Sequence, residues 1–426
     1  WRSLTSVVPA QRMARSCAWQ RPQSHAPRSK AFSGRRGGAG SDGQFAGASS
    51  ATAVAVRARA LCGAPSQSSA LKACGPLHAH VRQQSSASQA PSPRADFPAL
   101  PAFADQALRG FGQVVFCNSP ASGALIGAGL LWADPCLAAL AATGCVSATA
   151  AARVAGFDAG AVSAGLFGYN GALVGCAFAV FLGFEYMEPA MAATAAGGAA
   201  SALVTSRLGK VLTAVPQWTL AFNATAISAL LWARRSSVPS AAPAAAESAA
   251  PARGAAEMSL GEWCSSSLTG VSQIFVVNDA ISGALMLAGI VAYSAGAAAA
   301  TLLGSGLGAG AGAAWGADAE DVKAGLWGFN PALTSLAVSI FFVPLGFSPL
   351  VLVCGGAVAS AAATVVISGT FREALEVPSC TLPFCLVASG CYLLAGRLPG
   401  LALAAAPHSP EANLRAFRAA AAASAR

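Results

Sequence analysis

The segment QVVFCNSPASGAL at residues 113–125 returns as QIFVVNDAISGAL at residues 273–285. A second segment, GLFGYNGAL at 165–173, returns as GLWGFNPAL at 325–333. In each pair, the second segment begins 160 positions after the first. Two long matches at one offset indicate that the chain contains two copies of one unit.

A third pair of segments supports this interpretation. PQWTLAF at 216–222 returns as PSCTLPF at 378–384, at an offset of 162. Because the three pairs follow the same order at nearly the same offset, chance drift of an Ala-rich composition does not explain them. The sequence therefore predicts two homologous halves.

The composition is that of a membrane protein. Of the 426 residues, 55% are hydrophobic and only 10% are charged, whereas a soluble domain carries roughly a quarter of charged residues. A spanning helix needs about 20 apolar residues. We therefore expect an all-α integral membrane protein with apolar runs near the following residues: 107–133, 135–152, 160–183, 189–205, 211–232, 265–292, 295–316, 324–346, 349–368 and 380–404.

Several of these runs are interrupted by Gly, Pro or Asn. Non-helical backbone at membrane depth is tolerated only where protein buries it or where it lines a water-filled cavity. Repeated halves with breaks at corresponding positions predict a binding site between the halves, near the middle of the membrane.

The ends and the middle of the chain have a different composition. Residues 1–100 hold 13 Lys or Arg, two Asp and no Glu, which is typical either of an organelle transit peptide or of a disordered tail. We expect a first membrane repeat at 101–232, a Pro-, Ala- and Ser-rich linker at 233–262, a second repeat at 263–404 and a tail at 405–426. Because the excess basic charge lies outside the folded part, no nucleic-acid partner is expected.

Catalytic and metal-binding chemistry has few candidate residues. The 12 cysteines contain no CxxC pair. Because zinc sites require paired ligands at short spacing, these cysteines do not predict one. All four histidines lie outside the apolar runs: His25, His78, His80 and His408. We therefore predict neither an enzyme, nor a metal site, nor a cofactor.

Two pairs of polar residues lie inside apolar runs. Polar side chains at membrane depth are costly and are usually functional. Gln113 and Gln273 each offer one acceptor and two donors, although such a residue can also join one helix to another. Thr219 and Thr381 can donate and accept, or can bond to the backbone of their own helix.

Four asparagines belong to the same repeated segments. Asn is a preferred residue at helix N-termini. We expect these side chains to cap helix ends or to hold broken backbone beside a pore, rather than to contact a substrate: Asn118, Asn170, Asn278 and Asn330.

These segments resemble the urea transporter family. The similarity is carried by ALRGFGQVVF from 107, GYNGALVG from 168, GLWGFN from 325 and TLPFC from 381, and it extends from about 105 to 400. The resemblance implies two inverted repeats with about ten spanning helices and two half-membrane pore helices. It also implies a homotrimer in the lipid bilayer with one pore in each subunit.

The resemblance also implies roles for individual residues. Gln113 and Gln273 would serve an outer and an inner urea slot, and Thr219 and Thr381 would line the stretch between them. Phe116 and Leu173 would form one apolar wall, with Leu333 opposite.

The sequence departs from the family pattern at four places. Two Asn-Asn-Pro motifs are replaced by Asn118-Ser119-Pro120 and by Asn278-Asp279-Ala280. The first Thr-Leu-Pro-Phe motif has Ala221 in place of proline, and Val276 stands where the other half has Phe116. These changes bear on the shape of the slots and hence on selectivity.

The expected function is passive transport of urea or a similar small neutral amide. Urea is planar and neutral and carries four N–H donors. A pore for it therefore needs hydrogen-bond acceptors along the edge of the solute and apolar walls against its flat faces. A channel for ammonia or water, and a sensor or scaffold of the same fold that does not conduct, are the alternatives. The membrane is either the plasma membrane or that of an organelle.

Overall fold

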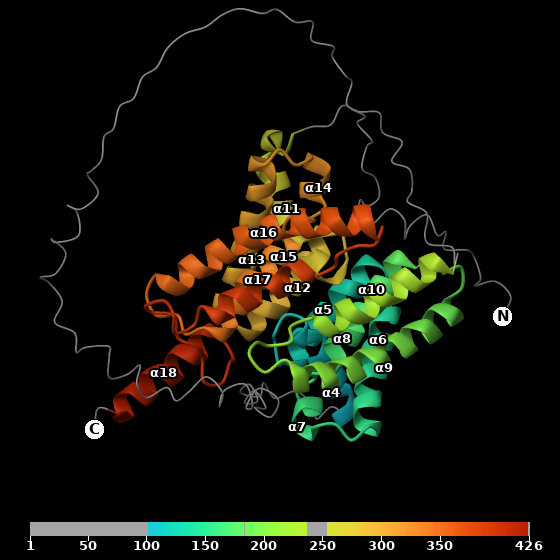
Figure 1. Cartoon of the computed structure of the whole chain (residues 1–426), viewed down its shortest axis with the longest axis horizontal. Helices are drawn as coiled ribbons and strands as arrows, with labels where there is room; N and C mark the ends of the chain where they lie inside the picture. The colour runs from blue at the N-terminus through green and yellow to red at the C-terminus, as the bar shows by residue number, and fades with distance from the viewer. Residues whose placement is uncertain (1–100, 183, 237–253, 425–426) are drawn as a thin grey trace, which may run out of the picture. The chain divides into compact units, whose positions relative to one another are not determined.

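The computed structural model describes residues 101–182, 184–236 and 254–424 (Figure 1). The expected leader or tail at 1–100 lies outside the described residues, as does the middle of the expected linker. Within the described ranges the chain is helical, and its β-structure consists of two isolated bridges, Gly254–Asp318 and Phe342–Leu403. The predicted all-α fold is confirmed for this part of the chain.

The first half of the described chain contains seven helices. They are α4 (Ala102–Gln113), α5 (Pro120–Ala133), α6 (Pro135–Val154), α7 (Ala159–Ser163), α8 (Gly168–Phe181), α9 (Met187–Val211) and α10 (Leu220–Arg235).

The second half follows the same order. Its elements are η1 (Ala255–Glu257), α11 (Leu260–Ser272), η2 (Gln273–Phe275), α12 (Ala280–Tyr293), α13 (Ala295–Ala314), α14 (Ala319–Lys323), α15 (Phe329–Phe341), α16 (Ser348–Ala374) and α17 (Leu382–Leu393), before a last helix, α18 (Pro410–Ser424). Helices α12, α13 and α14 begin 160 residues after α5, α6 and α7.

A sharp break separates α4 from α5. Phe116 adopts a left-handed backbone conformation with φ of 57°, which a helix cannot continue through. The next helix begins where the Ser119 hydroxyl accepts a hydrogen bond from Ser122 N–H and Pro120 takes the first helical position, both favourable at an N-terminus. The expected continuous run at 107–133 is therefore two helices.

The corresponding break in the second half has the same construction. Val276 has φ of 60°, and Asp279 Oδ1 accepts from Ser282 N–H at 2.6 Å. The helical segments on either side, Leu260–Phe275 and Ala280–Tyr293, are bent by 76°. A bend of this kind at membrane depth is typical of a broken span.

Three of the described helices, α6, α13 and α16, are long and apolar enough to cross a membrane. The bent pair α11–α12 would make a fourth span. Four further apolar helices, α5, α8, α15 and α17, have 12 to 14 residues, which is too short for a hydrocarbon core of about 30 Å. The expected count of ten spanning helices stays a prediction, because breaks divide several apolar runs into shorter helices.

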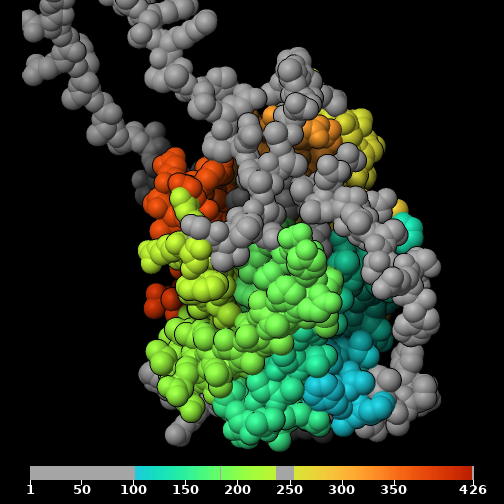
Figure 2. Space-filling model, turned by 90° about the vertical axis from the view of Figure 1, so that its right-hand side faces the viewer, coloured from blue at the N-terminus to red at the C-terminus, as the bar shows by residue number. Residues whose placement is uncertain are grey.

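Large apolar side chains are exposed on the face formed by α9 and α10. Figure 2 shows this face, on which the green residues of these helices predominate. Met191, Leu203 and Trp232 expose 43%, 52% and 67% of their surface. Such exposure fits a face that meets lipid or another protein rather than water.

The two halves contact each other reciprocally through α5 and α12. A Cβ added at Gly129 would lie 3.1 Å from the carbonyl oxygen of Ser282, and one added at Gly289 would lie 3.0 Å from that of Ser122. Because Gly289 and Ser282 are the counterparts of Gly129 and Ser122, each half presents the same surface to the other. Reciprocal contacts of this kind are what a two-fold relation produces.

The expected tail at 405–426 is partly folded onto the second half. Asn413 Nδ2 donates to Ile340 O at 2.7 Å. Glu411 accepts hydrogen bonds from the Ser294 hydroxyl and from Gly296 N–H at the start of α13. A carboxylate is favoured there by the free N–H groups of the helix terminus.

Candidate functional site

The two threonines of the repeated segments meet between the halves. Thr219 precedes α10 and Thr381 precedes α17, and their Oγ1 atoms are 2.7 Å apart. Both residues are buried. Two helix N-termini from different halves therefore converge on one pair of hydroxyls, and the positive ends of their dipoles disfavour a cation at this point.

Asn223 joins the two threonines. Its Nδ2 donates to Thr219 O and to Thr381 Oγ1, both at 2.9 Å, and its Oδ1 accepts from Thr381 N–H at 3.1 Å. The second half has Cys385 at the corresponding position, with Sγ 3.2 Å from Thr219 Oγ1. Asn223 is not among the residues predicted from sequence, although a polar residue one turn after Thr219 in an apolar helix is a signal of function.

Asn170 and Asn330 make equivalent contacts in the two halves. Asn170 Oδ1 accepts from Phe222 N–H at 3.1 Å, and its Nδ2 donates to Thr205 at 3.0 Å. Asn330 binds Phe384 N–H at 3.3 Å and Thr364 at 3.2 Å in the same way.

These two asparagines fix the backbone beside the threonine pair. Helices α10 and α17 begin at Leu220 and Leu382, and the first turn of a helix has free N–H groups that need acceptors. Each asparagine supplies such an acceptor from another helix. Both side chains are fully buried, so water does not replace them easily.

Gln113 and Gln273 also form a matched pair. Gln113 Nε2 donates to Ala164 O at 2.9 Å, and Gln273 Nε2 donates to Ala324 O at 2.8 Å. Each glutamine therefore links the end of a broken helix to the loop before α8 or α15. These contacts hold helix ends to loops. The expected role of Gln113 and Gln273 in urea slots stays a prediction.

The remaining asparagines differ from each other. Asn118 accepts from Arg109 Nη1 through both its side-chain oxygen, at 2.9 Å, and its backbone oxygen, at 3.0 Å. Asn278 is exposed, and the residue corresponding to Arg109 is Thr269. The side chains that cap α5 and α12 belong to the following residues, Ser119 and Asp279.

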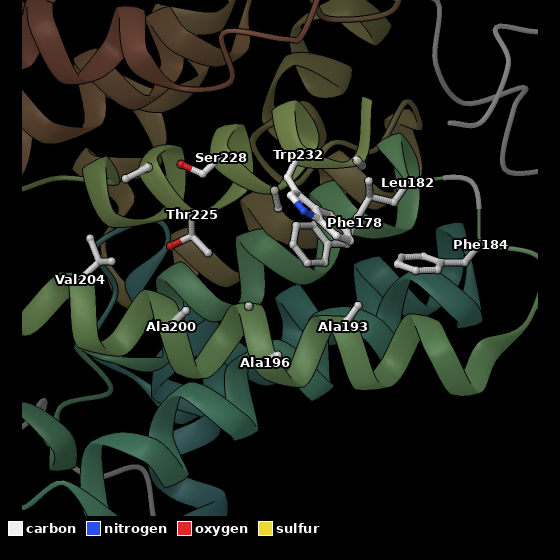
Figure 3. Close-up of a pocket in the computed structure, with 14 residues that line it drawn as sticks. Phe178, Leu182, Phe184, Ala193, Ala196, Ala200, Val204, Thr225, Ser228 and Trp232 are labelled. Atoms are coloured by element: carbon white, nitrogen blue, oxygen red, sulfur yellow. The ribbon is translucent and has the colours of Figure 1, made fainter. Parts of the chain in front are cut away.

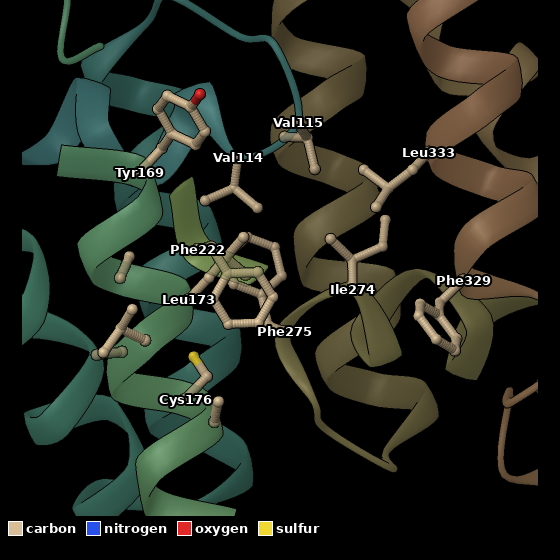
Figure 4. Packing of buried hydrophobic residues seen from close by; sticks show 14 of the residues in the cluster. Val114, Val115, Tyr169, Leu173, Cys176, Phe222, Ile274, Phe275, Phe329 and Leu333 are labelled. Atoms are coloured by element: carbon tan, nitrogen blue, oxygen red, sulfur yellow. The ribbon is translucent and has the colours of Figure 1, made fainter. Parts of the chain in front are cut away.

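The apolar candidates lie in one core cluster. Leu173 and Leu333 are fully buried (Figure 4). Phe116 packs at the edge of this cluster and retains some exposure. Its ring makes edge contacts with Trp218, Phe341 and Phe384 at centroid distances of 6.1, 5.8 and 6.4 Å.

A cavity of about 600 Å³ lies between α8, α9 and α10 (Figure 3). Thr225 and Ser228 carry the hydroxyls among its lining residues, and Thr225 already donates to Ala221 O of its own helix. No predicted site residue is among those that line the cavity. A cavity with so few free polar groups cannot replace the water around urea, so it does not serve as the site.

Among the described residues no group of three or more His, Cys, Asp or Glu side chains is placed to hold a metal ion. His408, the one histidine within the described ranges, stacks on Tyr293 with ring centroids 4.9 Å apart.

Comparison with known proteins decides the family. A model of the urea transporter family matches residues 104–396, which include every predicted site residue. The chain belongs to the urea transporter family. The resemblance noted in the sequence is thereby confirmed, and the chain is grouped with transport proteins rather than enzymes.

Curated relatives agree with this assignment. The chain is 32% identical over 314 residues to urea transporter 1 of Ovis aries, covering 72% of this chain and 80% of the relative. Urea transporter 1 of Mus musculus is 33% identical over 315 residues, with the same coverage. Residues 397–426, including α18, lie beyond the family match.

Proposed function

We propose that this protein conducts urea passively across a membrane, along a path that passes between its two halves at Thr219 and Thr381. The observation that carries the proposal is the meeting of these two hydroxyls, 2.7 Å apart, at the starts of two helices. Membership in the urea transporter family supports the choice of solute.

Urea has N–H donors that must find acceptors when it leaves water. Threonine hydroxyls and the carbonyl groups freed at broken helices supply such acceptors. The amide oxygens of Gln113 and Gln273 would serve the two slots on either side. An unpaired donor in an apolar slot costs about 1–3 kcal/mol, which discriminates against solutes of the wrong shape.

Apolar side chains would contact the flat faces of urea. Phe116 and Leu173 would form one wall and Leu333 the other. Asn118, Asn170, Asn278 and Asn330 would act on the pore indirectly, by holding the backbone around it.

The halves are proposed to be inverted repeats, with about ten spanning helices and two half-membrane helices. The reciprocal contact of α5 with α12 and the matched hydrogen bonds of Asn170 and Asn330 support a two-fold relation. We further propose a homotrimer with one pore in each subunit, embedded in lipid of a plasma or organelle membrane. The mass of the protein in detergent tests the trimer.

Urea influx into proteoliposomes containing the full chain tests the proposed function. Uptake should exceed that of protein-free vesicles and should be unchanged when sodium and proton gradients are removed. Water and methylamine, an ammonia analogue, should be measured in the same vesicles, because faster permeation of either than of urea would favour the alternative channels.

One observation favours a second candidate, a sensor or scaffold that does not conduct. The direct hydrogen bond between Thr219 and Thr381 leaves no room for a solute between the two hydroxyls. Urea must therefore separate them or replace their mutual bond. Folded protein with uptake equal to that of protein-free vesicles would support the second candidate.

A further inference from the structure

The two halves differ in side chain, but not in backbone, beside the threonine pair. Trp218 corresponds to Cys380, and both have a left-handed conformation, with φ of 46° and 49°. Phe116 corresponds to Val276, with φ of 57° and 60°. At both positions the first half carries an aromatic ring where the second half carries a much smaller side chain.

Trp218 is surrounded by aromatic rings from both halves. Its ring centroid lies 6.1 Å from that of Phe116, 5.0 Å from Phe341, 5.7 Å from Phe384 and 6.3 Å from Tyr392. All four contacts are edge-on, the geometry that aromatic pairs favour.

The rings do not close the cluster on every side. Trp218 exposes only 4% of its surface, whereas Phe116 and Phe341 are partly exposed. Trp218, which directly precedes Thr219 in the chain, is therefore one of the buried rings of the cluster, and Phe116 and Phe341 are its partly exposed rings.

Hydrogen bonds hold the indole in this position. Trp218 Nε1 donates to the Ser389 hydroxyl at 2.9 Å, and the backbone oxygen of Trp218 accepts from the Tyr169 hydroxyl. Ser389 belongs to α17 of the second half, and Tyr169 belongs to α8 of the first. The indole is thus held by the second half and the backbone of Trp218 by the first, and a fixed wall excludes larger solutes better than a flexible one.

We propose that Trp218, together with Phe116, sets the size limit of the transport path, so that solutes one methyl group larger than urea are rejected at this aromatic end. The end that carries Val276 and Cys380 is the wider one. The inference rests on the proposed function, because it requires a path past Thr219.

The permeability ratio of N-methylurea to urea in proteoliposomes tests the inference. Trp218→Cys gives the first half the residue of the second and should raise this ratio at least about tenfold, since one methyl group in a tight apolar site is worth roughly 10- to 200-fold. Trp232→Cys, the same substitution at an exposed position of α10, should leave the ratio unchanged.

Two milder variants keep the test decisive if Trp218→Cys does not fold. Trp218→Phe keeps an aromatic ring of smaller size. Ser389→Ala removes the hydrogen-bond partner of the indole and leaves the indole itself unchanged. Both should raise the ratio by a smaller factor. An unchanged ratio in the folded variants, with urea conducted by the wild-type protein, would overturn the size limit. A wild-type protein that conducts no urea would instead overturn the proposed function.

Discussion

The hydroxyl oxygens of Thr219 and Thr381 lie 2.7 Å apart although 162 residues separate them in the chain. They are counterparts in the two halves, and each stands immediately before a helix, α10 or α17. If the halves are related by a two-fold axis, as proposed, equivalent residues can touch each other only on or near that axis. The pair would then mark the point where a path between the halves is narrowest.

Gln113→Leu separates a role in transport from a role in packing. If the amide serves urea, flux per folded protein should fall about 5- to 150-fold, because a donor of the solute is left unpaired at about 1–3 kcal/mol. If it only holds the Ala164 carbonyl, folded yield should fall and normalised flux should not.

Gln106→Leu is the matched control. Gln106 is a buried glutamine of the same helix, and its Oε1 has no hydrogen-bond partner among the described residues. We expect normalised urea flux to match that of the wild-type protein. A similar loss in both variants would mean that any change in α4 slows transport, and the slot assignment of Gln113 would then fail.

Asn330→Ala should lower the midpoint of thermal unfolding in detergent. The change leaves Phe384 N–H without its acceptor at the start of α17, and a buried unpaired donor costs about 1–3 kcal/mol. Asn278→Ala, at an exposed position, should change stability by no more than about 0.5 kcal/mol. Equal midpoints for the two variants would show that the Asn330 contacts do not stabilise the fold.

Gly123→Ala and Gly127→Ala make a second matched pair, both on α5. A Cβ at Gly123 would lie 1.7 Å from the carbonyl oxygen of Leu108, whereas one at Gly127 would have no atom of the described ranges within 4 Å outside its own helix. The first substitution forces α4 and α5 apart and should strongly reduce the yield of folded protein. The second should raise helix propensity slightly and leave yield intact. Normal yield of Gly123→Ala would contradict the close packing of these helices.

The attachment of the C-terminal segment should depend on pH. Burial by itself would raise the pKa of Glu411, but hydrogen bonds from its own backbone, from Gly296 N–H and from Ser294 outweigh burial and lower it. A lowered pKa in the folded state means that the ionised form stabilises attachment. This contribution is complete above the ordinary pKa of 4.5 and is lost as the pH falls through the lowered value.

Hydrogen exchange of residues 410–424 measures this attachment. Exchange should be slow at neutral pH and faster near pH 3, after correction for the intrinsic rate. Glu411→Gln should exchange faster at neutral pH and should lose the pH dependence. An equal acid response in this variant would assign the response to another group.

The repeat allowed the paired residues of the candidate site to be named from sequence, and their role in transport stays a prediction. Matching segments identified Gln113 with Gln273 and Thr219 with Thr381, and apolar runs predicted helices. Pairing by offset does not say which side chains touch across the halves, because that depends on how the helices cross. The Thr219–Thr381 bond therefore required the structure.

Single positions without a matching partner were the hardest to predict. Asn223 has Cys385 as its counterpart, and Trp218 has Cys380. Because these pairs are unlike, the comparison of the two halves did not identify Asn223 or Trp218 as candidate site residues. Asn278 was paired with Asn118 by sequence, yet it is exposed, and Thr269 stands where Arg109 donates hydrogen bonds to Asn118.

The most direct test of the transport path is the urea permeability of proteoliposomes containing the double variant Thr219→Val, Thr381→Val. The double variant removes both partners of the Thr219–Thr381 bond, which by itself is nearly neutral for stability. It also leaves one N–H of Asn223 without its acceptor Thr381 Oγ1, at a cost of about 1–3 kcal/mol, so flux is normalised to the folded protein recovered. The loss of both hydroxyls should slow urea flux per folded protein by about 5- to 150-fold relative to the wild-type protein. Wild-type flux in the double variant would contradict a path that passes between these two residues.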